Sequence, residues 1–141
     1  MICQMIMIGL KGSNKKDIAN FMETLPSHDI GGVILYDDDL TSKDISTKNI
    51  IDSNQLKEFT FFLQSQFNTS LLIGIDQEGG QVNRLKNIDE YKDFESWAEI
   101  EKINEPLKTS SFAKRTAEAL KLHGINLNFA PVLDLDYGEG T

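Results

Sequence analysis

The sequence predicts an α/β fold in which helices cover a parallel β-sheet, and two observations support this prediction. First, four short stretches are almost continuously apolar, which is typical of strands buried on both faces. These stretches are Met5–Leu10, Gly32–Tyr36, Leu71–Ile75 and Leu127–Leu133. Second, amphipathic helical patterns separate them. The resulting order, β-α-β-α-β-α-β, predicts parallel strands joined by right-handed crossovers.

Three helices are expected between these strands, each with its apolar residues on one face. The segments are 13–25, 53–67 and 109–124. Ser13 or Asn14 suits the N-cap of the first helix, and Ser53 or Asn54 that of the second. Gly124 suits the left-handed turn that often ends a helix. The residues expected to face the core are Ile18, Phe21, Met22 and Leu25, then Leu56, Phe59, Phe62 and Leu63, then Phe112, Thr116, Ala119, Leu120 and His123.

Between Arg84 and Pro106 lies a polar segment that is longer than an ordinary connection from a strand to a helix. It carries the only tryptophan, Trp97. We expect Trp97 to fasten this segment to the core. Long connections on the carboxyl side of parallel strands commonly line binding sites.

The composition limits the classes of partner. The chain has 141 residues, with 14 Lys and Arg against 22 Asp and Glu, a formal net charge of −8. This balance argues against nucleic acid or an anionic membrane surface, whereas a neutral sugar would not be repelled. The single cysteine, Cys3, excludes an intramolecular disulfide, and we expect it to be a buried thiol in the first strand.

Both ends of the sequence carry expectations about the whole protein. The opening apolar run lacks a positively charged leader and is too short to cross a bilayer, so we expect a strand and a cytoplasmic location. At the other end, the last strand runs into a loop that ends at Thr141. This leaves an open parallel edge, so residues 1–141 are expected to form part of a larger barrel. Such edges would also permit self-association.

Asp76 and Arg84 are the candidate ligand-binding residues. Asp76 follows the third predicted strand directly, and ligands of parallel α/β folds bind at the carboxyl ends of strands. Gly79 and Gly80 allow the chain to turn sharply, so that Arg84 can return to the same place. A carboxylate and a guanidinium together can hold adjacent hydroxyls of a sugar ring. The alternative is that Asp76 caps the next segment and Arg84 is a surface residue.

Three other acidic residues lie near the same edge. We expect Glu78 to accept hydrogen bonds from the backbone of its own loop, because near neighbours in one turn seldom span a glycosidic bond. Asp134 and Asp136 end the fourth strand and either bond loop N–H groups, line the site, or bind a divalent cation with Asp76. The sequence has no glycine-rich phosphate loop, which weakens the metal hypothesis.

The histidines are not expected to take part in catalysis. His28 and His123 are the only two, and neither has a nucleophile beside it in the predicted fold. His123 ends a helix, where a positive charge would suit the helix dipole. We therefore expect both to be structural or exposed.

The run DQEGGQVNRL, residues 76–85, resembles the signature of glycoside hydrolase family 3. The stretches QMIMIGLKG, IGGVILY, NQLKEFTFFLQ and GINLNFAPVLDLD are similar to the family's first strand, second strand, following helix and fourth strand, in order. The resemblance covers essentially the whole chain and is strongest to bacterial β-N-acetylhexosaminidases. Two departures are Gln81, where many members have Arg, and YKDFESWAEI, which replaces a Pro-containing stretch.

This resemblance implies a TIM (β/α)8 barrel, of which residues 1–141 would be the N-terminal part, with about four strands and three helices. It implies a retaining glycosidase without a cofactor or metal, active in cell-wall recycling. Asp76 and Arg84 would bind the sugar that is cleaved off. The nucleophilic aspartate and the acid/base histidine would lie beyond Thr141, so this chain alone would be inactive. The alternatives are a β-glucosidase or β-xylosidase of the same family, or a non-catalytic carbohydrate-binding half-barrel.

Overall fold

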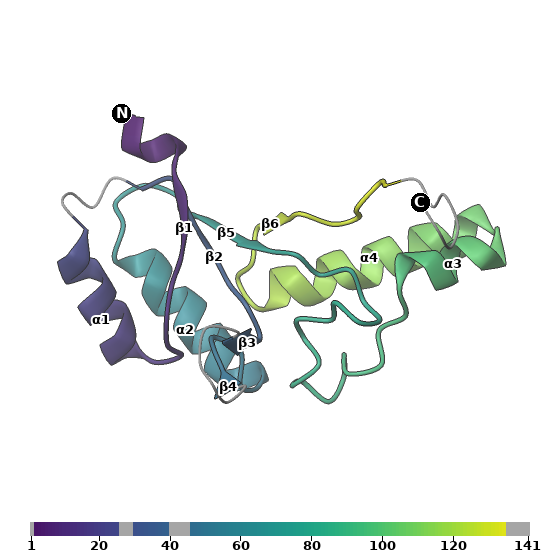
Figure 1. Ribbon diagram of the computed structural model, residues 1–141, viewed down its shortest axis with the longest axis horizontal. Helices are drawn as coiled ribbons and strands as arrows, with labels where there is room; N and C mark the ends of the chain where they lie inside the picture. Colours follow the sequence, from purple (N-terminus) through teal and green to yellow (C-terminus); the bar gives the residue numbers. More distant parts are fainter. Residues whose placement is uncertain (1, 26–29, 40–45, 135–141) are drawn as a thin grey trace, which may run out of the picture.

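A computed structural model describes residues 2–25, 30–39 and 46–134 of the chain. Its centre is a four-stranded parallel sheet in the order β1-β2-β5-β6 (Figure 1). The strands are β1 (Met7–Gly9), β2 (Gly32–Ile34), β5 (Leu72–Ile75) and β6 (Leu127–Asn128). The helices α1 (Lys15–Thr24), α2 (Ser53–Ser65) and α4 (Pro106–Leu122) connect successive strands. The predicted α/β class and the parallel order are confirmed.

The two faces of the sheet differ in what covers them. Each crossover joins neighbouring strands, and crossovers of one hand place their helices on one side. Val33 and Ile73, which are paired across β2 and β5, point to that side and are completely buried. Gly74 lies on the opposite face, where a Cβ atom would meet the side chains of Met7 and Phe129. One face of the sheet thus packs against the helices. On the other face, the side chains of Met7 and Phe129 lie close to Gly74 and leave no room for a larger residue there.

The predicted helix faces form the core. Ile18 and Met22 of α1 are buried. The predicted core residues that are also buried are Leu56, Phe59 and Leu63 of α2 and Phe112, Thr116, Ala119 and Leu120 of α4. Phe21, Leu25 and Phe62 are partly buried against the same cluster. Gly124 has a φ of 69° after α4, as predicted. The strands β1 and β6 are the edges of the described sheet, and self-association through them stays a prediction.

The helix starts agree only in part with the predicted caps. Asn14 caps α1 in a reciprocal arrangement, accepting from the N–H of Asp17 while the Asp17 carboxylate accepts from the N–H of Asn14. Asp52 caps α2, so the prediction of Ser53 or Asn54 was wrong. Three consecutive residues there are good caps, and the sequence alone does not distinguish them.

The polar segment after Arg84 contains a fourth helix that was not predicted, α3 (Trp97–Ile103). Ser96 and Glu99 form a capping box at its start, a local signal that the expectation of a loop overlooked. The Trp97 ring packs edge-on against Phe112 of α4, with 4.7 Å between ring centroids. The prediction that Trp97 fastens this segment to the body of the protein is confirmed.

Other short elements were also missed. Residues Ile2–Met5 form a 3-10 helix, η1, ahead of β1. Cys3 lies in this turn and is exposed, so the prediction of a buried thiol in the first strand was wrong. After β2, the strands β3 (Asp38–Asp39) and β4 (Ser46–Thr47) form an antiparallel pair.

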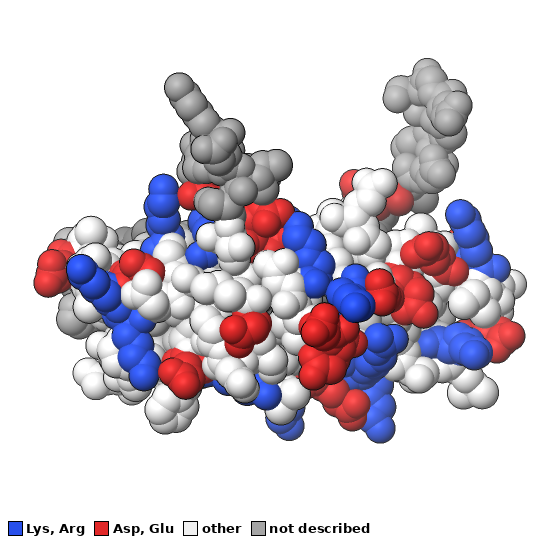
Figure 2. All heavy atoms as spheres, turned by 90° about the horizontal axis from the view of Figure 1, so that it is seen from below, with Lys and Arg blue, Asp and Glu red and all other residues white. Residues whose placement is uncertain are grey.

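Figure 2 shows the distribution of charged side chains on one face of the molecule. On that face, acidic and basic side chains are interspersed with each other and with uncharged residues. In the described part of the chain, no helix combines the length and the apolar character needed to cross a bilayer.

His123 links α4 to α2 as a neutral, structural residue. Its ring is fully buried, with 2.7 Å between Nδ1 and the carbonyl oxygen of Ala119 and 2.9 Å between Nε2 and Oγ of Ser53. A carbonyl only accepts, so Nδ1 carries the proton and Nε2 accepts from the hydroxyl. Burial lowers the pKa of His123. The prediction of a structural histidine is confirmed for His123, but the suggested positive charge at the helix end is not present at neutral pH. His28 lies outside the described residues.

This geometry predicts a pH-dependent stability. The folded pKa of His123 lies below its ordinary value of 6.5, so the unfolded chain binds the proton more readily and stability falls as pH drops below about 6.5. Urea unfolding at pH 7.5 and 5.0 should show that the variant His123→Gln loses less stability on acidification than wild type. Lys108→Gln, an exposed change on the same helix, is the control and should keep the wild-type dependence. Equal losses in wild type and His123→Gln would contradict the assignment.

Candidate functional site

The carboxyl ends of β2 and β5 bring two acidic residues to one edge of the sheet. The strands are parallel neighbours, with Ile34 paired to Gly74. Asp76 directly follows β5, as predicted, and Asp37 follows β2 by three residues. In parallel α/β folds this edge is where ligands bind.

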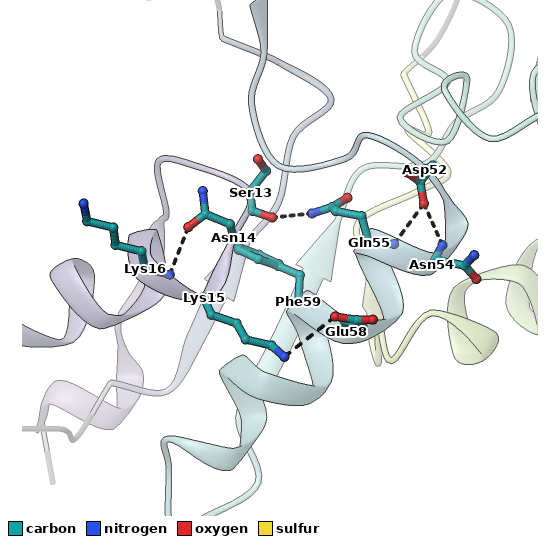
Figure 3. A pocket seen from close by; sticks show the side chains of 9 residues that line it. All are labelled: Ser13, Asn14, Lys15, Lys16, Asp52, Asn54, Gln55, Glu58 and Phe59. Carbon is teal, nitrogen blue, oxygen red and sulfur yellow. Dashed lines mark hydrogen bonds and ion pairs between the residues drawn. The ribbon is translucent and has the colours of Figure 1, made fainter.

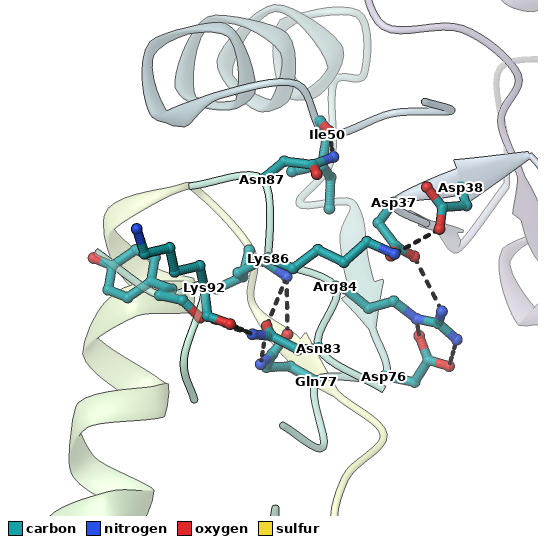
Figure 4. Close-up of polar contacts among 12 residues, drawn as sticks. Asp37, Asp38, Ile50, Asp76, Gln77, Asn83, Arg84, Lys86, Asn87 and Lys92 are labelled. Carbon is teal, nitrogen blue, oxygen red and sulfur yellow. Dashed lines mark hydrogen bonds and ion pairs between the residues drawn. The ribbon is translucent and has the colours of Figure 1, made fainter. Parts of the chain in front are cut away.

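Arg84 returns to Asp76 and forms a two-point ion pair, shown in Figure 4. Its Nε donates to Oδ1 of Asp76 at 2.8 Å, and its Nη2 donates to Oδ2 at 2.6 Å. The side chain of Asp76 is 30% exposed and that of Arg84 is 22% exposed. The predicted meeting of the two residues is confirmed, and the pair remains within reach of a ligand.

Asp37 is a second carboxylate partner of Arg84 that the sequence analysis missed. Its Oδ1 accepts from Nη1 of Arg84 at 3.0 Å, and its Oδ2 lies 2.7 Å from Nζ of Lys86. Lys86 also contacts Oδ2 of Asp38 at 2.6 Å. The five side chains form what we call the charged row: Asp76, Arg84, Asp37, Lys86 and Asp38. The sequence does contain a signal for Asp37 as a site residue, because Asp37 follows a predicted buried strand just as Asp76 does.

Mutual hydrogen bonds stabilise the charges of the row. Burial would raise the pKa of Asp37, but the hydrogen bonds and charges of Lys86 and Arg84 outweigh burial and lower it. The pKa of Lys86 is raised by its bonds to Asp37 and Asp38, and that of Arg84 is raised chiefly by Asp76. Three carboxylates face two cations, which leaves one formal negative charge. A polar, uncharged ligand fits this balance better than a polyanion.

The loop that carries Arg84 is built around two glycines and two buried amides. Gly79 and Gly80 have φ values of 80° and 55°, as predicted, and a Cβ on Gly79 would collide with the carbonyl oxygen of Glu95. Inside the loop, Nε2 of Gln77 donates to Oδ1 of Asn83 at 2.9 Å. Nδ2 of Asn83 donates to the carbonyl of residue 91 at 2.7 Å. The loop is therefore held from within, independently of the charged row.

The other predicted acidic residues do not join the row. Oε1 of Glu78 accepts from the backbone N–H of Val132 at 2.9 Å. The prediction of a backbone partner was correct, but that partner lies after β6 and not in the loop of Glu78 itself, as had been predicted. Asp134 is exposed and borders a hollow of about 740 Å³ beside Trp97 and Pro131. Asp136 lies outside the described residues. Within the described ranges, no three acidic, histidine or cysteine residues are grouped as a metal site would require.

A separate hollow of about 590 Å³ lies between the starts of α1 and α2, shown in Figure 3. Its polar groups already bind one another. Asp52 accepts from the backbone N–H groups of Asn54 and Gln55, and the Gln55 side chain donates to the carbonyl of Ser13 at 2.6 Å. These bonds cap and join the two helices, so we assign this hollow a structural role.

Comparison with known proteins identifies the chain's relatives. Residues 1–138 match the family described as "Glycosyl hydrolase family 3 N terminal domain". A beta-hexosaminidase of Methylobacillus flagellatus is 34% identical over 116 residues, which cover 78% of this chain and 30% of that protein. A beta-hexosaminidase of Thiobacillus denitrificans is 35% identical over 118 residues, covering 79% of this chain and 30% of that protein. The chain thus spans about a third of the length of these relatives.

Solved structures show the same fold. A family 3 β-N-acetylglucosaminidase from Paenibacillus sp. superposes with a TM-score of 0.73 and 26% identity, covering 95% of this chain and 24% of the other. NagZ from Neisseria gonorrhoeae, in complex with N-trifluoroacetyl-D-glucosamine, has a TM-score of 0.60 and 23% identity, covering 94% and 36%. The chain has the fold of the corresponding part of these proteins, which confirms the predicted fold class.

The Gly79 turn yields a stability prediction. Gly79→Ala should lower the free energy of unfolding by at least ~2 kcal/mol, because the new Cβ would meet the Glu95 carbonyl at a left-handed φ. Gln81→Ala, an exposed change in the same loop, should alter it by less than about 0.5 kcal/mol. Urea unfolding followed by circular dichroism measures both. Equal stability of the two variants would contradict this account of the turn.

Proposed function

Because the chain belongs to the glycosyl hydrolase family 3 N-terminal domain family, we propose that it supplies the sugar-binding part of a retaining β-N-acetylhexosaminidase. The names of the relatives and of the Paenibacillus structure support this substrate class. The intact enzyme would remove terminal β-linked N-acetylglucosamine, for example in cell-wall recycling. Residues 1–141 would form the N-terminal part of its barrel, and the nucleophile and acid/base would lie beyond Thr141.

The observation that carries the proposal is the two-point bond between Arg84 and Asp76 at the strand ends. Each oxygen of Asp76 accepts one bond from Arg84 and can accept another from a sugar hydroxyl. Arg84 has five N–H donors, of which the described carboxylates Asp76 and Asp37 take three. The remaining donors can reach a hydroxyl or carbonyl oxygen. The pair therefore offers acceptors and donors side by side, as adjacent ring hydroxyls require.

The charge of the site supports a neutral sugar as the partner. The charged row carries only one formal negative charge, and its cations are already paired. We also propose a cytoplasmic location, since the one cysteine, Cys3, is an exposed free thiol of the kind that persists in reducing compartments.

Sugar binding provides the test. Asp76→Asn and Arg84→Lys should each weaken the binding of N-acetylglucosamine at least about tenfold, because each removes a charged partner or the planar fork. Asp89→Asn is the matched control, since its side chain is 96% exposed and pairs only with Lys92 among described residues. NMR titration of the protein measures the dissociation constants. Unchanged affinity in both site variants would contradict the proposal.

The same measurements distinguish the alternatives. Tighter binding of glucose or xylose would favour the β-glucosidase or β-xylosidase alternative. The 141-residue chain should bind N-acetylglucosamine without cleaving a chromogenic β-N-acetylglucosaminide. Cleavage of that substrate by this chain would overturn the placement of nucleophile and acid/base beyond Thr141.

A further inference from the structure

We propose that Asp37 is a positioning residue, whose buried carboxylate holds the Arg84 guanidinium in the orientation that binds sugar. The inference rests on the sugar-binding role proposed above for Asp76 and Arg84. It assigns to the end of β2 a part in the site that neither the sequence signature nor the family match names. The occupant of the site remains a neutral sugar.

Asp37 acts through Arg84 because it is too deeply buried to touch a ligand. Its side chain is 3% exposed, compared with 22% for Arg84 and 30% for Asp76. Both carboxylate oxygens are occupied, Oδ1 by Nη1 of Arg84 and Oδ2 by Nζ of Lys86. Figure 4 shows this carboxylate between the two cations.

The contact with Asp76 alone does not fix the guanidinium. Asp76 holds the edge formed by Nε and Nη2, and a partly exposed pair of this kind can swing together about the bonds of the arginine side chain. Asp37 holds the third nitrogen, Nη1, from the segment that follows β2, whereas Asp76 follows β5. With all three nitrogens bonded to carboxylates at two fixed points, the plane of the guanidinium is set.

The position of Asp37 is itself fixed by the backbone around it. The carbonyl oxygen of Asp37 accepts from the N–H of Lys48 at 2.7 Å. The preceding N–H, that of Tyr36, donates to Oδ1 of the fully buried Asn49 at 2.9 Å. The Asn49 side chain also donates to the carbonyls of Leu10 and Gly12, just after β1. Asp37 is therefore anchored to the ends of two strands, while Arg84 stands on a loop.

This arrangement affects affinity by ordering Arg84 before the ligand arrives. A free arginine side chain loses rotamer freedom when it binds a ligand, and this loss weakens the binding. The bonds to Asp37 and Asp76 impose that order in the folded protein. The unused donors of Arg84 then face a ligand in one fixed geometry.

The test compares Asp37→Asn with Asp89→Asn. Both changes remove one carboxylate charge, but Asp37 contacts Arg84, whereas Asp89 is 96% exposed and lies outside the charged row. In protein labelled with ¹⁵N-arginine, the wild type should show separate, slowly exchanging Nη proton signals for Arg84. Asp37→Asn should average the Nη1 signals and weaken N-acetylglucosamine binding about tenfold. Asp89→Asn should keep the signals separate and change the affinity less than about twofold.

The outcomes separate this inference from the proposed function. Wild-type affinity in Asp37→Asn, or averaged Nη1 signals already in the wild type, would overturn the positioning role and leave sugar binding intact. The Nη signals of the wild-type protein test the positioning role even if Asp37→Asn fails to fold. Absence of N-acetylglucosamine binding in wild type, with Nη signals that still depend on Asp37, would overturn the proposed function and support the positioning of Arg84.

Discussion

The site depends on one guanidinium shared by two carboxylates from neighbouring strand ends. Arg84 joins Asp76, after β5, to Asp37, after β2, and this is possible only because the two strands are adjacent and parallel. Bonds of this charged type contribute about 1.5–3 kcal/mol each, but burial of the charges offsets part of that gain. The arrangement therefore contributes less to stability than to geometry: it fixes where acceptors and donors stand at the sheet edge.

Side-chain amides hold the backbone near these charges in place. Asn126 donates to the carbonyl of Leu71 and accepts from the N–H of Ile73, and Oδ1 of Asn128 accepts from the N–H of Gln77. These side chains extend the bonding of β5 and β6 up to the residue next to Asp76. The backbone beneath the charged row is thus held by uncharged groups, whose hydrogen bonds do not depend on pH or on a bound ligand.

The sequence predicted those features that follow from local patterns. Apolar runs gave the strands, helical spacing gave the buried faces of α1, α2 and α4, and the glycine pair indicated the turn that returns Arg84 to Asp76. The cap Asp52 was missed because three neighbouring residues suit that position, and α3 was missed although its capping box is a local signal. The sequence shows that Asp37 follows a strand, but the partners of Glu78 and Asp37 come from distant segments, and only the folded chain shows which groups they meet.

Exposure increases along the bonded path from Asp37 to Arg84 to Asp76, and this order explains how one site can be both rigid and accessible. A carboxylate in water would leave the arginine mobile, whereas a fully buried pair could not reach a ligand. Placing the anchor inside and the binding groups outside separates the two requirements. The charges are divided between buried and exposed positions in the same way. The buried Asp37 compensates the partly exposed Lys86 and Arg84, so the outer groups meet a sugar without a large net field.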